Sequence, residues 1–125
     1  MFAGEVDLKT WYKPNIDKKT LKELSKRSDI KGLIDVSIFI FALILSGYLC
    51  IISWGTLWSI PALLLYGNIF YCKIISIAHE TNHETYFKTR ALNKFFYHIT
   101  SFLGSFEAVR WKWSHFHHHT YTIFT

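Results

Sequence analysis

Two long apolar blocks constrain this chain more than any other feature of its sequence. Residues 32–54 carry a single charge, Asp35, near their start, and residues 57–78 carry a single charge, Lys73, near their end. As a helix that rises about 1.5 Å per residue, each block is roughly 33 Å long, which is enough to cross a bilayer core of about 30 Å. We therefore predict transmembrane helices at 32–54 and 57–78.

The alternative is a soluble protein that buries both helices. With 125 residues in total, the chain is too short to surround two helices that are apolar on every side. Only residues 53–56 join the two blocks, and Trp54 and Trp58 lie at this connection. The short connection predicts a helical hairpin with aromatic residues at one membrane interface.

The basic residues predict how the hairpin is oriented. The connection carries no charge, whereas residues 1–31 contain eight Lys or Arg and residues 79–125 contain five. Because cytoplasmic flanks are enriched in such residues, both segments are expected in the cytoplasm. The net charge of +5 then reflects basic flanks beside an anionic membrane surface, and no nucleic-acid partner is needed to explain it. A short basic helix within 17–33, either on the membrane surface or fully solvated, is also expected.

A third apolar pattern follows the second block. Between Leu92 and Phe106, apolar residues recur at steps of three and four, which predicts a helix with one apolar face. About fifteen residues are too few to span a bilayer, so we expect this helix to lie in the interface. Its polar face is predicted from four residues: Lys94, His98, Ser101 and Ser105.

All seven histidines lie after the second apolar block, and two of them form the string His79-Glu80-Thr81-Asn82-His83. This H-E-x-x-H pattern is typical of zinc proteases, in which the histidines bind the metal and the glutamate is the general base. On a helix, residues four apart share one face, so His79 and His83 are suitably placed to bind one metal ion. Histidines also occur at this spacing on ordinary helices.

A second histidine motif lies about thirty residues downstream. His115, His118 and His119 form the pattern H-x-x-H-H, whose spacings place them on one side of a helix, whereas His117 is expected to point away. Two histidine motifs on the same side of the membrane predict a metal centre with more than three imidazole ligands. Such ligands suit zinc, copper, iron or nickel, so the metal is not identified by them.

Together the two motifs resemble those of the integral-membrane fatty acid desaturases and their hydroxylase relatives. The stretch HETNHETYFKTRALN, residues 79–93, is similar to the first histidine box of that family, and WKWSHFHHHTYT, residues 111–122, is similar to the second. The upstream stretch YKPNIDKKTLKELSKRSDIKGL is similar to the amino-terminal segment of bacterial members. The resemblance covers nearly the whole chain.

The resemblance implies a non-haem di-iron oxidoreductase of lipid metabolism and fatty acid biosynthesis, built as an all-helical four-span bundle in the bacterial inner membrane. Two iron ions would be ligated at the cytoplasmic side, and the enzyme would use O2 and electrons from a ferredoxin or cytochrome b5-type donor to desaturate a fatty acyl lipid or acyl-CoA. The implied ligands are His79, His83, His115, His118 and His119. Three carboxylates are candidates for orienting the imidazoles: Glu80, Glu84 and Glu107.

Family members carry a third histidine box after two further spans, and residues 79–125 contain only the first two. Because five histidines are too few for two irons, we expect this polypeptide to be an inactive amino-terminal fragment of a longer desaturase, with residues 79–125 as the truncated cytoplasmic and interfacial part of its domain. Three alternatives are a related hydroxylase or ketolase acting on an alkane, sterol or carotenoid, a membrane zinc protease, and a metal-handling membrane scaffold without redox chemistry.

Overall fold

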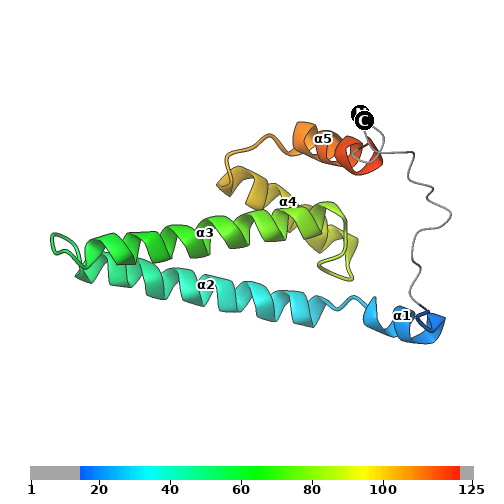
Figure 1. Ribbon diagram of the computed structural model, residues 1–125, viewed down its shortest axis with the longest axis horizontal. Coiled ribbons are helices and arrows are strands. Elements are labelled where there is room, and N and C mark those ends of the chain that lie inside the picture. Colours follow the sequence, from blue (N-terminus) through cyan, green and yellow to red (C-terminus); the bar gives the residue numbers. More distant parts are fainter. Residues whose placement is uncertain (1–14, 122–125) are drawn as a thin grey trace, which may run out of the picture.

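The computed structural model describes residues 15–121, and within this range the chain is entirely helical (Figure 1). Residues 1–14 of the predicted amino-terminal segment and residues 122–125, after the second histidine motif, lie outside the described range. The five helices are α1 (Lys18–Leu24), α2 (Asp29–Ile52), α3 (Ser59–Asn82), α4 (Arg90–Leu103) and α5 (Ala108–Tyr121).

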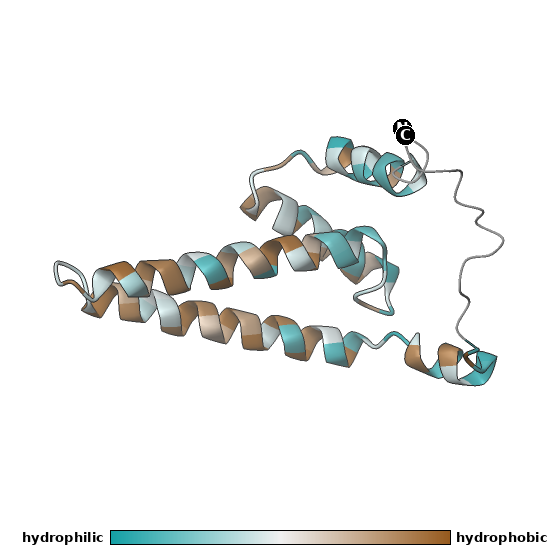
Figure 2. Ribbon diagram, viewed as in Figure 1, coloured by the Kyte–Doolittle hydropathy of each residue, from teal (hydrophilic) through white to brown (hydrophobic). Residues whose placement is uncertain are grey.

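Helices α2 and α3 run side by side in opposite directions and form the predicted hairpin (Figure 1). Both are long and apolar enough to cross a membrane, yet only 17% of the most apolar stretch of α2 and 11% of that of α3 is buried within this chain. The core helix of a soluble protein would be mostly buried. The apolar residues along the hairpin in Figure 2 therefore require another apolar environment, such as lipid.

The boundaries differ slightly from those predicted. Helix α2 begins at Asp29, three residues before the first apolar block, because the Ser28 side chain accepts a hydrogen bond from the Lys31 amide and caps the helix. Helix α3 begins at Ser59 and ends at Asn82, so it includes His79, and His83 is its C-cap.

The only charges within the two apolar blocks form an ion pair. Lys73 Nζ lies 2.6 and 2.8 Å from the two carboxylate oxygens of Asp35, and the Tyr86 hydroxyl donates a hydrogen bond to the same carboxylate. Because the helices are antiparallel, a charge near the start of α2 lies at the level of a charge near the end of α3. The pairing of Asp35 with Lys73 favours a single register of the hairpin, since any other register would leave two charges unpaired among apolar residues.

Residues 83–89 connect α3 to α4, and side chains of α4 and of α2 hold this loop in place. The Phe87 side chain is fully buried, and the Asn93 side chain accepts a hydrogen bond from the Phe87 amide (3.0 Å) and donates one to the Phe87 carbonyl (2.9 Å). The amide and hydroxyl of Thr89 donate to the Asp29 carboxylate at 2.8 and 2.7 Å. The loop is thereby held against the start of α2.

Helix α4 is present as predicted, but its exposed and buried residues agree only in part with the predicted apolar and polar faces. Phe95 and Phe102 remain exposed, in keeping with an apolar outer face, whereas the prediction that Ser101 lies on the polar face is wrong. Ser101 is 2% exposed, and its hydroxyl donates to the Tyr97 carbonyl at 2.6 Å. Because its hydrogen bond is made within the helix and its side chain is small, Ser101 can be buried without an unsatisfied polar group.

Gly32 provides a test of how the loop packs on α2. A Cβ atom at this position would lie 2.6 Å from two ring carbons of Phe87 and 3.2 Å from the Tyr86 carbonyl oxygen. We expect Gly32→Ala to destabilise the protein by about 1–3 kcal/mol, because the buried ring has no space to move. Thermal unfolding in detergent micelles measures this change.

Gly67→Ala is the matched control, since a Cβ atom there would meet nothing within 4 Å. A helical Gly→Ala replacement in open space stabilises by about 0.5–1 kcal/mol. The packing described here is contradicted if Gly32→Ala and Gly67→Ala change stability in the same direction.

Candidate metal centre

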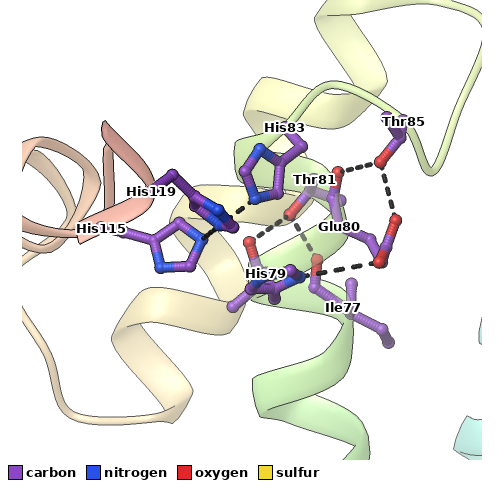
Figure 3. A network of polar contacts seen from close by, with 9 residues as sticks. Ile77, His79, Glu80, Thr81, His83, Thr85, His115 and His119 are labelled. Carbon is purple, nitrogen blue, oxygen red and sulfur yellow. Dashed lines mark hydrogen bonds and ion pairs between the residues drawn. The ribbon is translucent and has the colours of Figure 1, made fainter. Parts of the chain in front are cut away.

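Four histidines from two helices converge in one group (Figure 3). The group lies at the carboxyl end of α3, which is the end of the hairpin away from the 53–58 turn (Figure 1). His79 lies in the last turn of α3 and His83 caps that helix, whereas His115 and His119 lie one turn apart on α5. Each offers one ring nitrogen, and these four atoms all lie within 4.8 Å of one another. The two motifs, separated by about thirty residues in sequence, thus form one group in space.

Neutral imidazoles cannot turn all of the short contacts inside the group into hydrogen bonds. His115 Nε2 lies 3.0 Å from His83 Nε2 and also 3.0 Å from His119 Nε2. A neutral imidazole nitrogen carries either one N–H or one lone pair, so His115 Nε2 can make only one of these contacts as a full hydrogen bond. A cation between the three nitrogens would satisfy all of them at once.

The dimensions of the group fit a single metal ion. Imidazole nitrogens bind zinc at about 2.0–2.1 Å in a tetrahedral arrangement, so nitrogens on one zinc ion lie roughly 3.3–3.4 Å apart. The observed nitrogens range from 3.0 Å for the closest pairs to a limit of 4.8 Å. The closest pairs would separate by a few tenths of an ångström, and a pair at the 4.8 Å limit would close by roughly 1.4 Å, to form a tetrahedral site.

The electrostatics of the group favour the metal-binding form of the rings. Partial burial, followed by the neighbouring imidazoles of His79 and His119, lowers the pKa of His83 below its ordinary value of 6.5. Partial burial also lowers the pKa of His115, followed by the neighbouring imidazoles, of which His79 and His119 have the largest effects. Both rings therefore remain neutral at pH 7, which is the state in which imidazole binds a metal.

Glu80 lies beside the group but does not point into it (Figure 3). One carboxylate oxygen is 3.6 Å from His79 Nδ1, and the other accepts a hydrogen bond from the Thr85 hydroxyl at 2.7 Å. This arrangement leaves His79 Nε2 available and places a carboxylate beside Nδ1, the side from which carboxylates commonly support metal-bound histidines. The sequence did not single out Thr85, which follows the motif by two residues.

Aromatic packing supports α5, which has no buried residue of its own. The Trp111 ring stacks on His115 with centroids 4.8 Å apart and planes at 4°, and it also contacts Phe106. The Tyr97 hydroxyl of α4 donates to the Ala108 carbonyl at 2.5 Å. Since these contacts are few, the imidazoles contribute a large part of the junction between α5 and α3. The position of Trp111, four residues before His115, is the sequence signal that could have predicted this stack.

The structure does not place His118 in the four-histidine group, although the sequence predicts it as a ligand with His115 and His119. Its ring centroid lies 6.3 Å from that of His115 and 5.8 Å from that of His119. On a helix, residues 118 and 119 differ by about 100° in direction, and α3 faces the edge formed by 115 and 119. His117 lies against Tyr121, as expected for a residue that points away from the group.

Two of the three carboxylates predicted to orient imidazoles have other partners. Glu84 accepts a hydrogen bond from Arg90 Nε at 2.9 Å. Glu107 accepts hydrogen bonds from the amides of Val109 and Arg110, which caps the start of α5 and lowers the pKa of Glu107. Of the three, Glu80 alone contacts a histidine of the group in the part of the chain that the structure describes.

Comparison with known proteins finds no matching family model, no matching curated protein and no matching solved structure. The function is therefore inferred from the residues and their arrangement.

Metal binding tests the group directly. We expect the purified chain to bind one Zn²⁺ through the four histidines, and His115→Ala to weaken binding by at least 10–100-fold, the loss typical of even an outer supporting residue. Isothermal titration calorimetry measures both. His117→Ala is the matched control from the same helix and should bind like the unchanged chain. Equal losses in the two variants would contradict the site.

Metal affinity should also depend on pH. Because the folded pKa values of His83 and His115 lie below 6.5, affinity should be nearly constant above pH 7 and fall as protons occupy the imidazoles at lower pH. The same shift disfavours the charged rings in the folded state, so α5 docking should also weaken as pH falls through about 6.5 and below. Zn²⁺ titrations between pH 8 and pH 5 measure the first effect. Affinity that does not change with pH would exclude imidazole ligands.

Proposed function

We propose that this chain carries imidazole metal ligands of a membrane-bound, O2-dependent oxidoreductase of the fatty acid desaturase kind. The observation that carries the proposal is the convergence of His79 and His83 with His115 and His119 within 4.8 Å. Two motifs similar to the desaturase histidine boxes thus lie together in space, as a shared metal centre requires.

The surroundings of the group also support an acyl substrate. The group lies at the end of a hairpin whose two helices are long and apolar enough to cross a membrane. Beside it is a mostly apolar hollow lined by residues of α3 and by Trp111, and this hollow extends from His79 along α3 to Tyr71. A lipid chain could therefore approach the imidazoles directly from the bilayer.

The number of imidazoles favours a redox metal over a protease zinc. Catalytic zinc sites have three protein ligands and an open position for water, whereas four protein ligands are typical of closed structural sites. Iron takes up to six ligands and would keep open positions with four imidazoles. Glu80 is directed at His79 and Thr85 rather than at the centre of the group, so it is poorly placed as a general base.

The residues of the chain would have distinct roles in this function. Four histidines would hold the metal, Glu80 and Thr85 would fix the His79 ring, and Trp111 would keep His115 in place and shield it from water. Iron bound at the site would supply the dioxygen chemistry needed to remove hydrogen from an unactivated methylene group. Electrons would come from a ferredoxin or cytochrome b5-type donor.

A centre with two irons needs more ligands than these four imidazoles. His118 is the described histidine adjacent to the group on α5 and is the first candidate for a second ion, and the other ligands would come from further residues. Additional membrane-spanning helices, as in a four-span bundle, would also cover the exposed apolar sides of the hairpin.

Lipid analysis tests the proposed activity. The product of the complete reading frame would be expressed in a host that lacks its own desaturases, and acyl chains would be analysed by gas chromatography and mass spectrometry. We expect new double bonds with the unchanged protein and with His117→Ala, and at least a 100-fold loss with His119→Ala, because the metal centre loses a ligand. Hydroxylated acyl chains without double bonds, or equal activity of the two variants, would contradict the proposal.

A further inference from the structure

A basic hollow lies at the bend between α1 and α2, and none of the four histidines of the metal centre lines it. Four cationic side chains line it: Lys26, Arg27, Lys31 and Lys88. They come from the α1–α2 connection, the first turn of α2 and the 83–89 loop, so the fold brings them together from segments about sixty residues apart. The hairpin ion pair and the imidazole group use none of these four side chains.

The hollow is positively charged. Two carboxylates, Glu23 and Asp29, also line it, so four positive charges face two negative ones. The Asp29 carboxylate already accepts two hydrogen bonds from Thr89, which compensate part of its charge. An anion that entered the hollow would therefore meet a net positive field.

Part of the hollow is held in place before any ligand arrives. Arg27 Nη1 donates a hydrogen bond to the Glu84 carbonyl at 2.7 Å, which joins the α1–α2 connection to the loop after α3. Thr89 and Asp29 join the same loop to the start of α2. Lys88 is consequently kept on the same side as Lys26 and Lys31, and an anion would not need to order these segments itself.

The neighbours of the basic residues indicate which anion fits. Leu24 is 78% exposed and Ile30 is 71% exposed, and both line the same hollow. This combination of large exposed apolar side chains and lysines occurs where a protein enters the membrane interface, with apolar residues among acyl chains and cations among headgroups. The hollow also adjoins the first turn of α2, the helix whose length suits a membrane span. Figure 2 shows hydrophilic residues gathered at this end of the hairpin.

From these observations we propose that the hollow at the α1–α2 bend binds the phosphate headgroup of an anionic phospholipid. The lysines and Arg27 would contact the phosphate, and Leu24 and Ile30 would contact the upper parts of the acyl chains. The site would hold the end of α2 at a fixed depth in the anionic leaflet. This inference does not depend on the metal centre or on the proposed oxidoreductase function.

Retention of single lipids tests the proposal. The purified chain in detergent would receive phosphatidylglycerol or phosphatidylcholine, and native mass spectrometry would count the lipids that remain bound. We expect one phosphatidylglycerol per chain to be retained at least tenfold more than phosphatidylcholine. In the triple variant Lys26→Gln, Lys31→Gln, Lys88→Gln, this preference should fall at least tenfold.

The matched control removes the same charge elsewhere, with Lys94→Gln, Arg110→Gln and Lys112→Gln on α4 and α5. It should retain phosphatidylglycerol within twofold of the unchanged chain. An equal loss in both triple variants would show that only net charge matters, and would overturn the site. If millimolar inorganic phosphate displaced the lipid completely, the ligand would be a free phosphate and the lipid assignment would be wrong.

The far-UV circular dichroism and the thermal unfolding midpoint of each variant, measured in the same detergent, report whether the fold is intact. Should the triple variant fail this check, Lys31→Gln alone provides the same comparison against Lys112→Gln. We expect at least a threefold weaker preference for phosphatidylglycerol in Lys31→Gln. No difference between these two single variants would contradict the proposal.

Discussion

The arrangement of this molecule depends on how the 83–89 loop is fixed to the start of α2. Phe87 is buried against Gly32, and Asn93 satisfies both backbone polar groups of Phe87. These contacts reverse the chain direction immediately after the first histidine motif. Without that reversal α4 would not lie along α3, and α5 would not return to the level of His79.

Few direct contacts hold α5 once the chain has returned. The Trp111 ring on His115 and the hydrogen bond from Tyr97 provide a platform, but α5 has no buried residue. The imidazoles of α3 and α5 meet at this sparsely packed junction. There the Nε2 atoms of His83 and His119 both lie within hydrogen-bonding distance of His115 Nε2, which can form only one of the two hydrogen bonds. Metal binding would therefore complete the metal centre and stabilise the packing of α5 at the same time, because an ion that binds only the folded arrangement favours it.

Much of this arrangement follows from sequence periodicity, and the exceptions have physical reasons. The hairpin and the i, i+4 faces of His79 with His83 and of His115 with His119 depend on local spacing, which a sequence displays. The pairing of Asp35 with Lys73 depends on the register of two packed helices, and uniformly apolar faces do not specify that register. Likewise, spacing places both His118 and His119 on the side of α5 that carries His115, but the direction from which α3 approaches decides that His119 joins the group and His118 does not.

The predicted polar face of α4 was wrong at Ser101 for a related reason. Residue type suggested exposure, but a hydroxyl bonded to its own helix is neutral toward burial, and its small size suits a helix contact. The ion pair and the basic hollow were also beyond prediction, since both combine residues from distant segments.

The most direct measurement of the central claim is the number of imidazoles on the bound metal. Extended X-ray absorption fine structure of the metal-loaded chain counts nitrogen neighbours and detects the outer-ring scattering of histidine. With zinc as the bound metal, joint binding by α3 and α5 predicts four imidazoles at about 2.0–2.1 Å. Two imidazoles, with oxygen atoms in the remaining positions, would mean that the H-E-x-x-H string binds alone and would contradict a centre shared by both helices.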